Sequence, residues 1–378
     1  MPRASSNRGL WPRVAASAIA SLLAGCAAEQ DEFRVVWSGD LLEVLVAGEP
    51  PSTCGGTYDY MDDHLRIVGE QLGVTEPERV YYHYGFGGSV VAENCDGSVE
   101  ACAIGSDVFT ATLPDEHELT HAVRPSGQLA YLPVEEGLAE FFGSDVEPIQ
   151  QPVGNVLELL QAHEQGEKLD RPFYQVMGHF VSYLAYRFGF DRVAEFARES
   201  VLDEPFLAMQ EKFAAVFGAD LESIVVDHAG STACNRAFYR VTAVDCARDV
   251  RRVLTQGDTA QLDLDLDCNS DDVIGPRDGE RWRRDVVELA VGGWVLLDWT
   301  RPVGTEAAHV RMRPCDSGCD AVVGLEALSF EVPPEQPGGS MACLSAGRHV
   351  IRTAVGDEDT GGIILSLTVL GPAPDCGG

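Results

Sequence analysis

The run HELTH, residues 117–121, constrains the fold of this chain more than any other feature, because its two histidines are one helical turn apart. On a helix, both imidazoles leave the same face and can bind a single metal ion. Glu118 would lie about 100° around the helix from His117, beside the ion, where it could deprotonate a metal-bound water. The segment therefore predicts a helix that carries a metal site.

A second short helix, beginning at Pro133, supplies the next candidate ligand. Glu136 would complete a His–His–Glu set and leave a fourth position open, as catalytic zinc requires and structural zinc does not. Glu135 is a rival ligand, but Glu136 is favoured because it has a carboxylate, Glu140, one turn further on. The alternative is an amphipathic helix with two chance histidines. The combination of HELTH with EGLAE favours the zinc site.

The run HELTHAV, residues 117–123, resembles the active-site helix of thermolysin-type and aminopeptidase-N-type zinc metallopeptidases, the gluzincins. In that group the third zinc ligand is the glutamate of a motif similar to EGLAE, which maps onto Glu136. A carboxylate four residues later braces a ligand histidine, and Glu140 holds that place. The gap from His121 to Glu136 is shorter than in those prototypes and resembles the bacterial peptidase MA-like branch. The resemblance implies a zinc peptidase with Glu118 as the general base.

Residues 174–189, YQVMGHFVSYLAYRFG, resemble a further family stretch, in which a tyrosine and a glycine precede an apolar helix. In aminopeptidase-N-like enzymes that tyrosine donates its hydroxyl to the oxyanion of the tetrahedral intermediate, which implies this role for Tyr174. A structural tyrosine at the helix start is the alternative. His179 and, more weakly, Tyr131 are other candidate donors. The remaining histidines have no partner at ligand spacing and are interpreted as surface or core residues: His64, His83, His163, His228, His309 and His349.

The first 25 residues have the pattern of an export signal, in which three arginines precede an apolar run over Val14–Leu23. The run LAGC, residues 23–26, resembles a bacterial lipobox; an ordinary secretory signal is the alternative. The lipobox predicts an acylated Cys26, followed by a short tether over residues 26–32. Ala27 resembles lipoproteins that are sent to an outer membrane. We therefore expect an exported lipoprotein at the outer membrane or cell surface of a bacterium, which contacts the membrane through its lipid alone, because no later segment is long and apolar enough to span it.

Eleven cysteines occur in the chain, and ten remain when Cys26 is set aside. An even number in an exported chain favours disulfides over zinc clusters, and no CxxC pair occurs. Three of the ten precede the metal site and seven follow it, so complete pairing needs at least one bridge between the two groups. We expect Cys95 and Cys102 to close a local loop, which leaves Cys54 to pair with a late cysteine.

The formal net charge of −33 restricts the partners of the protein. Such a surface repels nucleic acid and anionic lipid. We therefore expect a peptide or protein substrate and no nucleic-acid partner, while no pattern in the sequence indicates an oligomeric state.

The periodicity of the chain changes along its length and predicts two domains. Residues 33–229 combine short strands with helices, and their order resembles an α+β zincin-like metallopeptidase domain: a small mixed sheet with the active-site helix, then a helical lower lobe. The resemblance places the strand Val108–Thr112 at the cleft edge, where it would pair with extended substrate. Residues 256–372 alternate like the strands of an all-β sandwich, loosely similar to pre-peptidase C-terminal domains. Residues 230–255 are predicted to be a cysteine-containing linker.

Two other classes of protein fit the same sequence. One is a zinc-bearing binding lipoprotein that has lost turnover, and the other is an adhesion protein that uses the zincin fold as a scaffold. Glu118 favours the enzyme, because a site that only binds metal does not need a general base.

Overall fold

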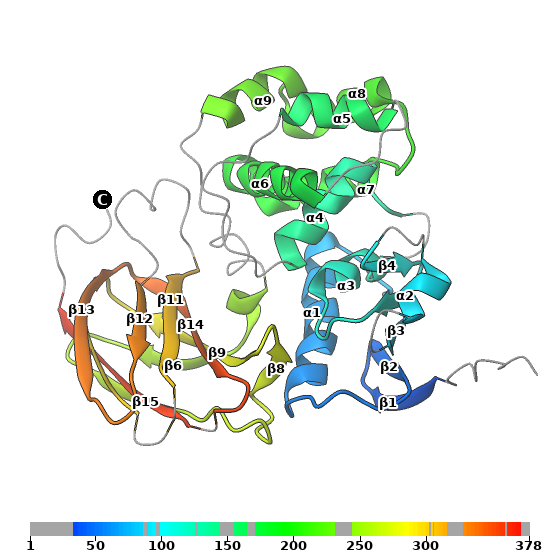
Figure 1. The fold of residues 1–378 in the computed structure, drawn as a ribbon. Helices are drawn as coiled ribbons and strands as arrows, with labels where there is room; N and C mark the ends of the chain where they lie inside the picture. Colours follow the sequence, from blue (N-terminus) through cyan, green and yellow to red (C-terminus); the bar gives the residue numbers. More distant parts are fainter. Residues whose placement is uncertain are drawn as a thin grey trace, which may run out of the picture. The chain divides into compact units, whose positions relative to one another are not determined.

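The computed structural model describes residues 33–85, 89–95, 99–124, 128–143, 155–164, 171–230, 244–301, 304, 306–315, 328–359 and 361–371. The predicted signal, residues 1–25, and the predicted tether, residues 26–32, lie outside the described residues. From Phe33 onward the chain forms one compact unit. It mixes helices and sheets, with a helical part followed by a β-rich part (Figure 1).

A five-stranded sheet opens the described chain. Its strands are β1 (Arg34–Ser38), β2 (Leu42–Ala47), β3 (Val80–Gly85), β4 (Ala101–Ile104) and β5 (Asp107–Thr110). The spatial order is β1-β2-β3-β5-β4, in which the two outer strands run antiparallel to their neighbours and the inner pairs are parallel. The first two strands form an antiparallel pair, and the alternation over residues 42–47 buries every second side chain.

The edge of this sheet differs from the prediction. β5 pairs with β3 on one side and with β4 on the other, so the strand that runs towards the metal helix is an inner strand. The prediction that Val108–Thr112 lies at the edge is therefore wrong. The edge strand next to β5 is β4, which has only four residues and follows the short helix α2 (Ser89–Asn94). A strand this short, which contains Cys102 and ends at a turn, has too little alternation to be recognised in the sequence.

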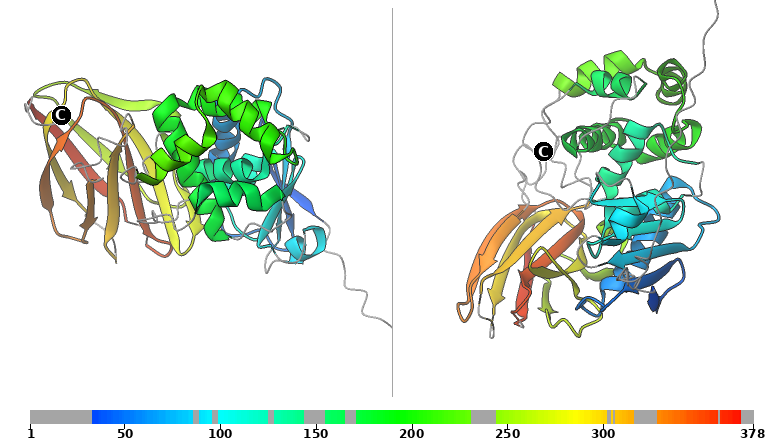
Figure 2. Two further views of the ribbon diagram at one scale, coloured as in Figure 1. Left: turned by 90° about the horizontal axis from the view of Figure 1, so that it is seen from above. Right: turned by 45° about the vertical axis from the view of Figure 1, so that its right-hand side comes forward.

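Eight further helices lie in the described part of the first 230 residues. They are α1 (Thr57–Leu72), α3 (Glu116–Ala122), α4 (Leu132–Gly143), α5 (Val156–Glu164), α6 (Arg171–Phe188), α7 (Phe190–Glu199), α8 (Phe206–Phe217) and α9 (Leu221–Gly230). α1 ends at Gly73, whose positive φ of 72° closes the helix. Helices α4 to α9 gather on the side of α3 that is away from β1 and β2 (Figures 1 and 2). None of the described helices is long and apolar enough to cross a membrane.

The β-rich part contains two sheets that enclose a common hydrophobic core. Its strands are β6 (Val250–Leu254), β7 (Thr259–Leu264), β8 (Ile274–Arg277), β9 (Glu280–Leu289), β10 (Gly293–Thr300), β11 (Ala308–Pro314), β12 (Leu328–Val332), β13 (Gly338–Leu344), β14 (Gly347–Gly356) and β15 (Ile363–Gly371). One sheet has the order β13-β10-β15-β7 and the other β12-β11-β14-β9-β6, with β8 paired to β9. Buried Leu264 and Leu297 of the first sheet share the core with Ile351 of the second. β6 forms inside the segment predicted as a linker, where it pairs with β9.

Disulfides connect distant parts of the sequence. Cys54 is bonded to Cys268 across 214 residues, which confirms that Cys54 pairs with a late cysteine. The predicted local bridge between Cys95 and Cys102 is also confirmed. A third disulfide joins Cys246 to Cys315, and Cys343 is disulfide-bonded as well. The other four cysteines lie outside the described residues: Cys26, Cys234, Cys319 and Cys376.

Candidate metal centre

Three side chains from two packed helices meet at one point. His117 and His121 extend from α3, and Glu136 extends from α4. Oε2 of Glu136 lies 3.2 Å from Nε2 of His117 and 3.5 Å from Nε2 of His121, and the two nitrogens are 3.3 Å apart. Ligands held at about 2.0–2.1 Å by a tetrahedral zinc ion lie roughly 3.4 Å from each other. The three atoms therefore have the mutual spacing of ligands to one such ion.

The electrostatics of this cluster keep the carboxylate ionised. Burial opposes ionisation of Glu136, but the adjacent imidazoles of His121 and His117 outweigh it and lower the pKa of Glu136 to about 2. Burial likewise disfavours the charged form of His121, yet the Glu136 carboxylate prevails and raises the pKa of His121. An anion flanked by two imidazoles is a donor set that a divalent cation can bind by displacing protons from the rings.

A carboxylate lies near the outer nitrogen of each ring. Nδ1 of His121 lies 3.2 Å from Oε1 of Glu135, and Nδ1 of His117 lies 3.8 Å from Oε1 of Glu140. A neutral imidazole that donates its Nδ1–H to a carboxylate has an unprotonated Nε2, and the hydrogen bond fixes the orientation of the ring. This arrangement is usual for a metal-binding histidine. The structure thus places Glu136 on the Nε2 side, while the rival Glu135 lies behind His121.

Arg124 supplies the partner of the buried Glu135 side chain. The two side chains form an ion pair, and both are almost fully buried. The backbone N–H of Ala130 donates to the second oxygen of Glu135 at 3.0 Å. Burial lowers the pKa of Arg124 to about 10, so the guanidinium still carries its charge at neutral pH. Sequence reasoning missed Arg124; the available signal was a basic residue three positions after His121.

Glu118 lies beside the cluster, on the same helix. The side chain of Asp115 caps this helix by accepting a hydrogen bond from the backbone N–H of Glu118 at 3.3 Å. Burial, followed by the charge of Asp115, raises the pKa of Glu118 to about 7, while His117 and His121 act in the opposite direction. A carboxyl group with a pKa near 7 suits general acid–base chemistry at neutral pH.

Of the three candidate oxyanion donors, the structure brings Tyr174 to the cluster. Its ring stacks on His117, with centroids 5.8 Å apart and planes 21° from parallel. His179 is buried elsewhere, where its Nδ1 shares a hydrogen bond of 2.7 Å with Nε2 of His228 on α9. Tyr131 is fully buried and donates its hydroxyl to the carbonyl of Leu160. Both side chains make hydrogen bonds within the helical packing, so the geometry favours Tyr174 among the three candidates.

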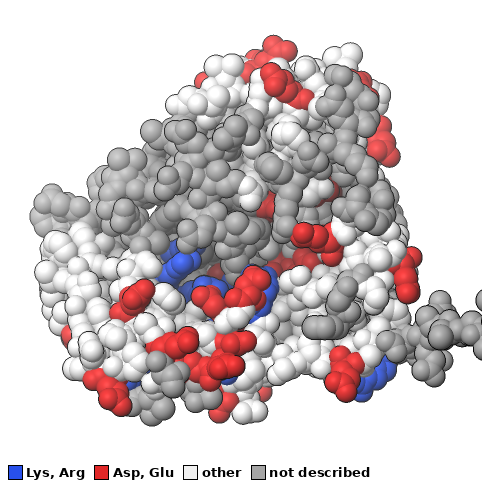
Figure 3. Space-filling model, in the orientation of Figure 1, with Lys and Arg blue, Asp and Glu red and all other residues white. Residues whose placement is uncertain are grey.

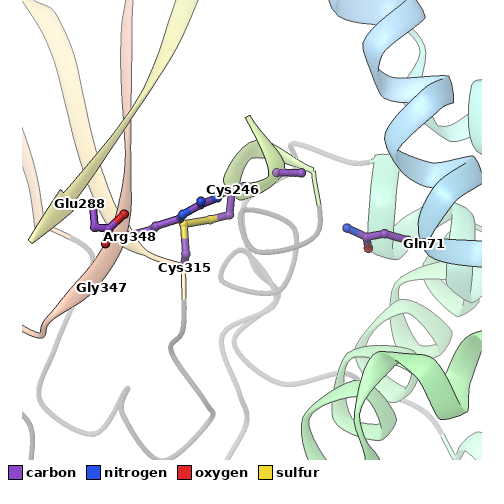
Figure 4. Close-up of a pocket in the computed structure, with 7 residues that line it drawn as sticks. Gln71, Cys246, Glu288, Cys315, Gly347 and Arg348 are labelled. Carbon is purple, nitrogen blue, oxygen red and sulfur yellow. Dashed lines mark hydrogen bonds between the residues drawn. A yellow bond between two sulfur atoms is a disulfide. The ribbon is translucent and has the colours of Figure 1, made fainter. Parts of the chain in front are cut away.

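Away from this cluster, the described residues include an open pocket of about 520 Å³. Gln71 of α1 faces it from one side, and the Cys246–Cys315 disulfide with Arg348 faces it from the other (Figure 4). None of its lining residues belongs to the metal cluster. Acidic side chains are scattered over the face shown in Figure 3, in keeping with the net charge.

Comparisons with known proteins give no family for this chain. No protein-family model and no curated protein matches it. Solved structures that share weak likeness include a Podospora anserina GH26-CBM35 β-(1,4)-mannanase (9% identity, 32% of this chain, 29% of that chain, TM-score 0.21). Others are an Arthrobacter globiformis T6 isomalto-dextranase complexed with panose (14% identity, 30% and 24% covered, TM-score 0.20) and a Paenibacillus barengoltzii β-glucosidase (10% identity, 47% and 20% covered, TM-score 0.15). The chain spans less than a third of the length of each, and TM-scores this low do not establish a shared fold.

Proposed function

We propose that this protein is a zinc-dependent metallopeptidase of the gluzincin type. The observation that carries the proposal is the convergence of Nε2 of His117, Nε2 of His121 and Oε2 of Glu136 at ligand spacing, with both outer ring nitrogens facing carboxylates. Two imidazoles and one carboxylate are a donor set of catalytic zinc sites, and they leave a coordination position for water or substrate. The carboxylates behind the two rings support this assignment, because two histidines that met by chance would not need such partners.

The residues around the cluster have distinct tasks in this proposal. Zinc, when bound, supplies a Lewis acid that activates water and polarises a carbonyl group near neutral pH. Glu118 accepts a proton from the attacking water and delivers it to the leaving amine, for which a pKa of about 7 is suitable. Tyr174, stacked on His117, donates its hydroxyl to the oxyanion that develops on the substrate carbonyl.

The edge strand β4 is our candidate for substrate alignment. It pairs only with β5 among the described strands, so no described strand occupies its outer edge, where we place an extended peptide. β4 also packs against α3, which carries the two histidines. We therefore assign the pairing with substrate to Ala101–Ile104 and not to Val108–Thr112.

The same proposal includes the architecture of the two domains and the location of the protein. We assign residues 33–229 to a zincin-like domain and residues 256–372 to an all-β sandwich. Cys26 carries the lipid that holds the protein at the outer membrane or cell surface, where it meets peptide or protein substrates. The net charge of −33 supports the exclusion of nucleic acid as a partner.

A digest of a broad peptide library by the purified ectodomain tests the function. The zinc-loaded wild type should cleave peptides, and a chelator or Glu118→Gln should abolish most of this activity. A fully zinc-loaded wild type that cleaves nothing would favour the catalytically silent binding or adhesion lipoprotein instead.

A further inference from the structure

The residue before the first metal-site histidine connects α3 to the β-rich part. Glu116 is buried with an exposed fraction of 3%, on the side of α3 that faces α1. Tyr60 of α1 donates its hydroxyl to Oε1 of Glu116 at 3.0 Å, and Arg277 of β8 forms an ion pair with Oε2. The same guanidinium donates to the carbonyl of Pro114 at 3.1 Å. One side chain from the β-rich part therefore binds the chain on both sides of the start of α3.

Arg277 is itself held in place by its surroundings. Its guanidinium lies 5.3 Å from the ring centroid of Trp282, which belongs to the hydrophobic core shared with α1 and β2. Two residues before Arg277, Gly275 exchanges hydrogen bonds with Thr57 at the first turn of α1. The nearby Cys54–Cys268 disulfide adds a covalent connection. Because β8 is fixed to α1 in this way, Arg277 is a rigid point of attachment for α3.

The face of α3 that packs against α1 makes further polar contacts. Tyr60, which donates to Glu116, accepts a hydrogen bond of 2.7 Å from Arg284 of β9, and Arg284 also binds Asp245 at 2.6 Å. One turn along α3, Thr120 lies 3.2 Å from Nε2 of His64 on α1. These contacts set the rotation of α3 about its axis, which determines the direction of His117 and His121, about 100° around the helix from Glu116 and Thr120.

The short length of α3 makes such contacts necessary. It has seven residues, Glu116–Ala122, and an isolated helix of this length is not stable in water. A metal centre requires ligand distances that are correct to about 0.2 Å. The position of α3 must therefore be imposed from outside the helix.

We propose that Arg277 is a positioning residue for the metal centre, acting through Glu116 and the carbonyl of Pro114. In this view the β-rich part is a structural component of the centre, because it supplies the cation that fixes the start of the metal helix. The inference rests on the proposed metal centre but not on peptide hydrolysis.

Cobalt(II) binding tests the inference, because its affinity and visible spectrum report the ligand geometry without any substrate. The variants are Arg277→Met, Arg277→Lys and the matched control Arg352→Met. Arg352 lies at the same 5.3 Å from the Trp282 ring as Arg277, and it forms an ion pair of 3.7 Å with Glu280 of β9. Circular dichroism and thermal melting establish that each variant is folded.

We expect Arg277→Met to lower cobalt affinity about 10-fold, as changes behind a ligand do, and to alter the spectrum. Arg277→Lys should recover part of the affinity, because a lysine can pair with Glu116 but lacks the planar guanidinium that lies over the Trp282 ring and fixes the position of the charge. Arg352→Met should bind cobalt like the wild type.

Equal affinity and an identical spectrum in folded Arg277→Met and Arg352→Met would overturn the inference. If Arg277→Met does not fold, Arg277→Lys decides: reduced affinity with an altered spectrum supports the inference, and wild-type behaviour overturns it. A protein that shows the Arg277 dependence but cleaves no peptide would refute the proposed peptidase alone. A wild type that binds neither cobalt nor zinc would refute the metal centre and this inference together.

Discussion

Glu135 and Glu136 are neighbours in the sequence, yet they contact opposite sides of one imidazole. Oε1 of Glu135 lies 3.2 Å from Nδ1 of His121, and Oε2 of Glu136 lies 3.5 Å from Nε2. Successive residues of a helix diverge by about 100°, so two adjacent glutamates on α4 can reach around a ring that lies between them. One carboxylate is placed to bind a metal ion and the other to orient its ligand.

The two glutamates should differ in their effect on metal binding. Glu136→Gln should lose most of the zinc, because two protein ligands bind zinc weakly. Glu135→Gln should retain zinc with affinity lowered about 10–100-fold, since Glu135 orients His121 and is not itself a ligand. Metal analysis after dialysis against a graded chelator measures both. The opposite ranking would assign the ligand role to Glu135. Full zinc occupancy in His117→Ala would refute the assignment of the metal site.

Glu118 should be needed for proton transfer and not for metal binding. Glu118→Gln should keep its zinc and its fold, because the amide is nearly isosteric with the carboxyl group. Peptide hydrolysis should fall by about 10²-fold or more, since the amide cannot accept the proton of water. The measurement is kcat/KM for a peptide identified in the library digest, with metal content determined on the same sample. Equal rates in wild type and Glu118→Gln would refute the mechanism while leaving the metal site intact.

Tyr174 should act mainly on the transition state. Tyr174→Phe should lower kcat with a smaller change in KM, because a hydrogen bond to the oxyanion strengthens only as charge develops. Tyr131→Phe is a control in which a hydroxyl is lost from the buried helical packing, and it should reduce stability with kcat unchanged. A normal kcat in Tyr174→Phe would leave the tyrosine a packing role against His117.

His64 should make the stability of the fold depend on pH. Burial is the main cause that lowers its pKa from 6.5 to about 4, so the unfolded chain binds this proton more tightly than the folded one. The contribution of neutral His64 is therefore complete above pH 6.5 and is lost as the pH falls towards 4. A shift of this size corresponds to about 3 kcal/mol in the free energy of unfolding.

Denaturant unfolding of wild type and His64→Gln between pH 7 and pH 4 measures this contribution. The variant should lose less stability than the wild type over that interval. His309→Gln, which removes an exposed histidine from β11, should follow the wild type. Parallel curves for wild type and His64→Gln would contradict the proposed source of the pH dependence.

The sequence predicted those parts of the molecule that depend on short-range spacing. The set His117, His121 and Glu136 was accessible because ligand chemistry and helical periodicity act within 20 residues. The contacts of Arg277 with Glu116 were not accessible, since they join positions 161 residues apart and neither residue belongs to a motif. The edge of the first sheet was assigned wrongly because strand order depends on pairing between segments, which alternation within one segment does not specify.

The two predicted disulfides should differ strongly in their effect on stability. In the chain-entropy model, a bridge that spans 214 residues stabilises the fold by about 5 kcal/mol and one that spans 7 residues by about 2 kcal/mol. Replacement of Cys54 and Cys268 by serine should therefore lower the free energy of unfolding by about 3 kcal/mol more than the same replacement at Cys95 and Cys102. Urea denaturation of the two double variants under non-reducing conditions provides the comparison. Because Cys54 and Cys268 also lie near the contacts that hold β8 against α1, the first variant should lower cobalt affinity as well. Equal stabilities would mean that the long bridge joins segments that are already held together in the unfolded chain.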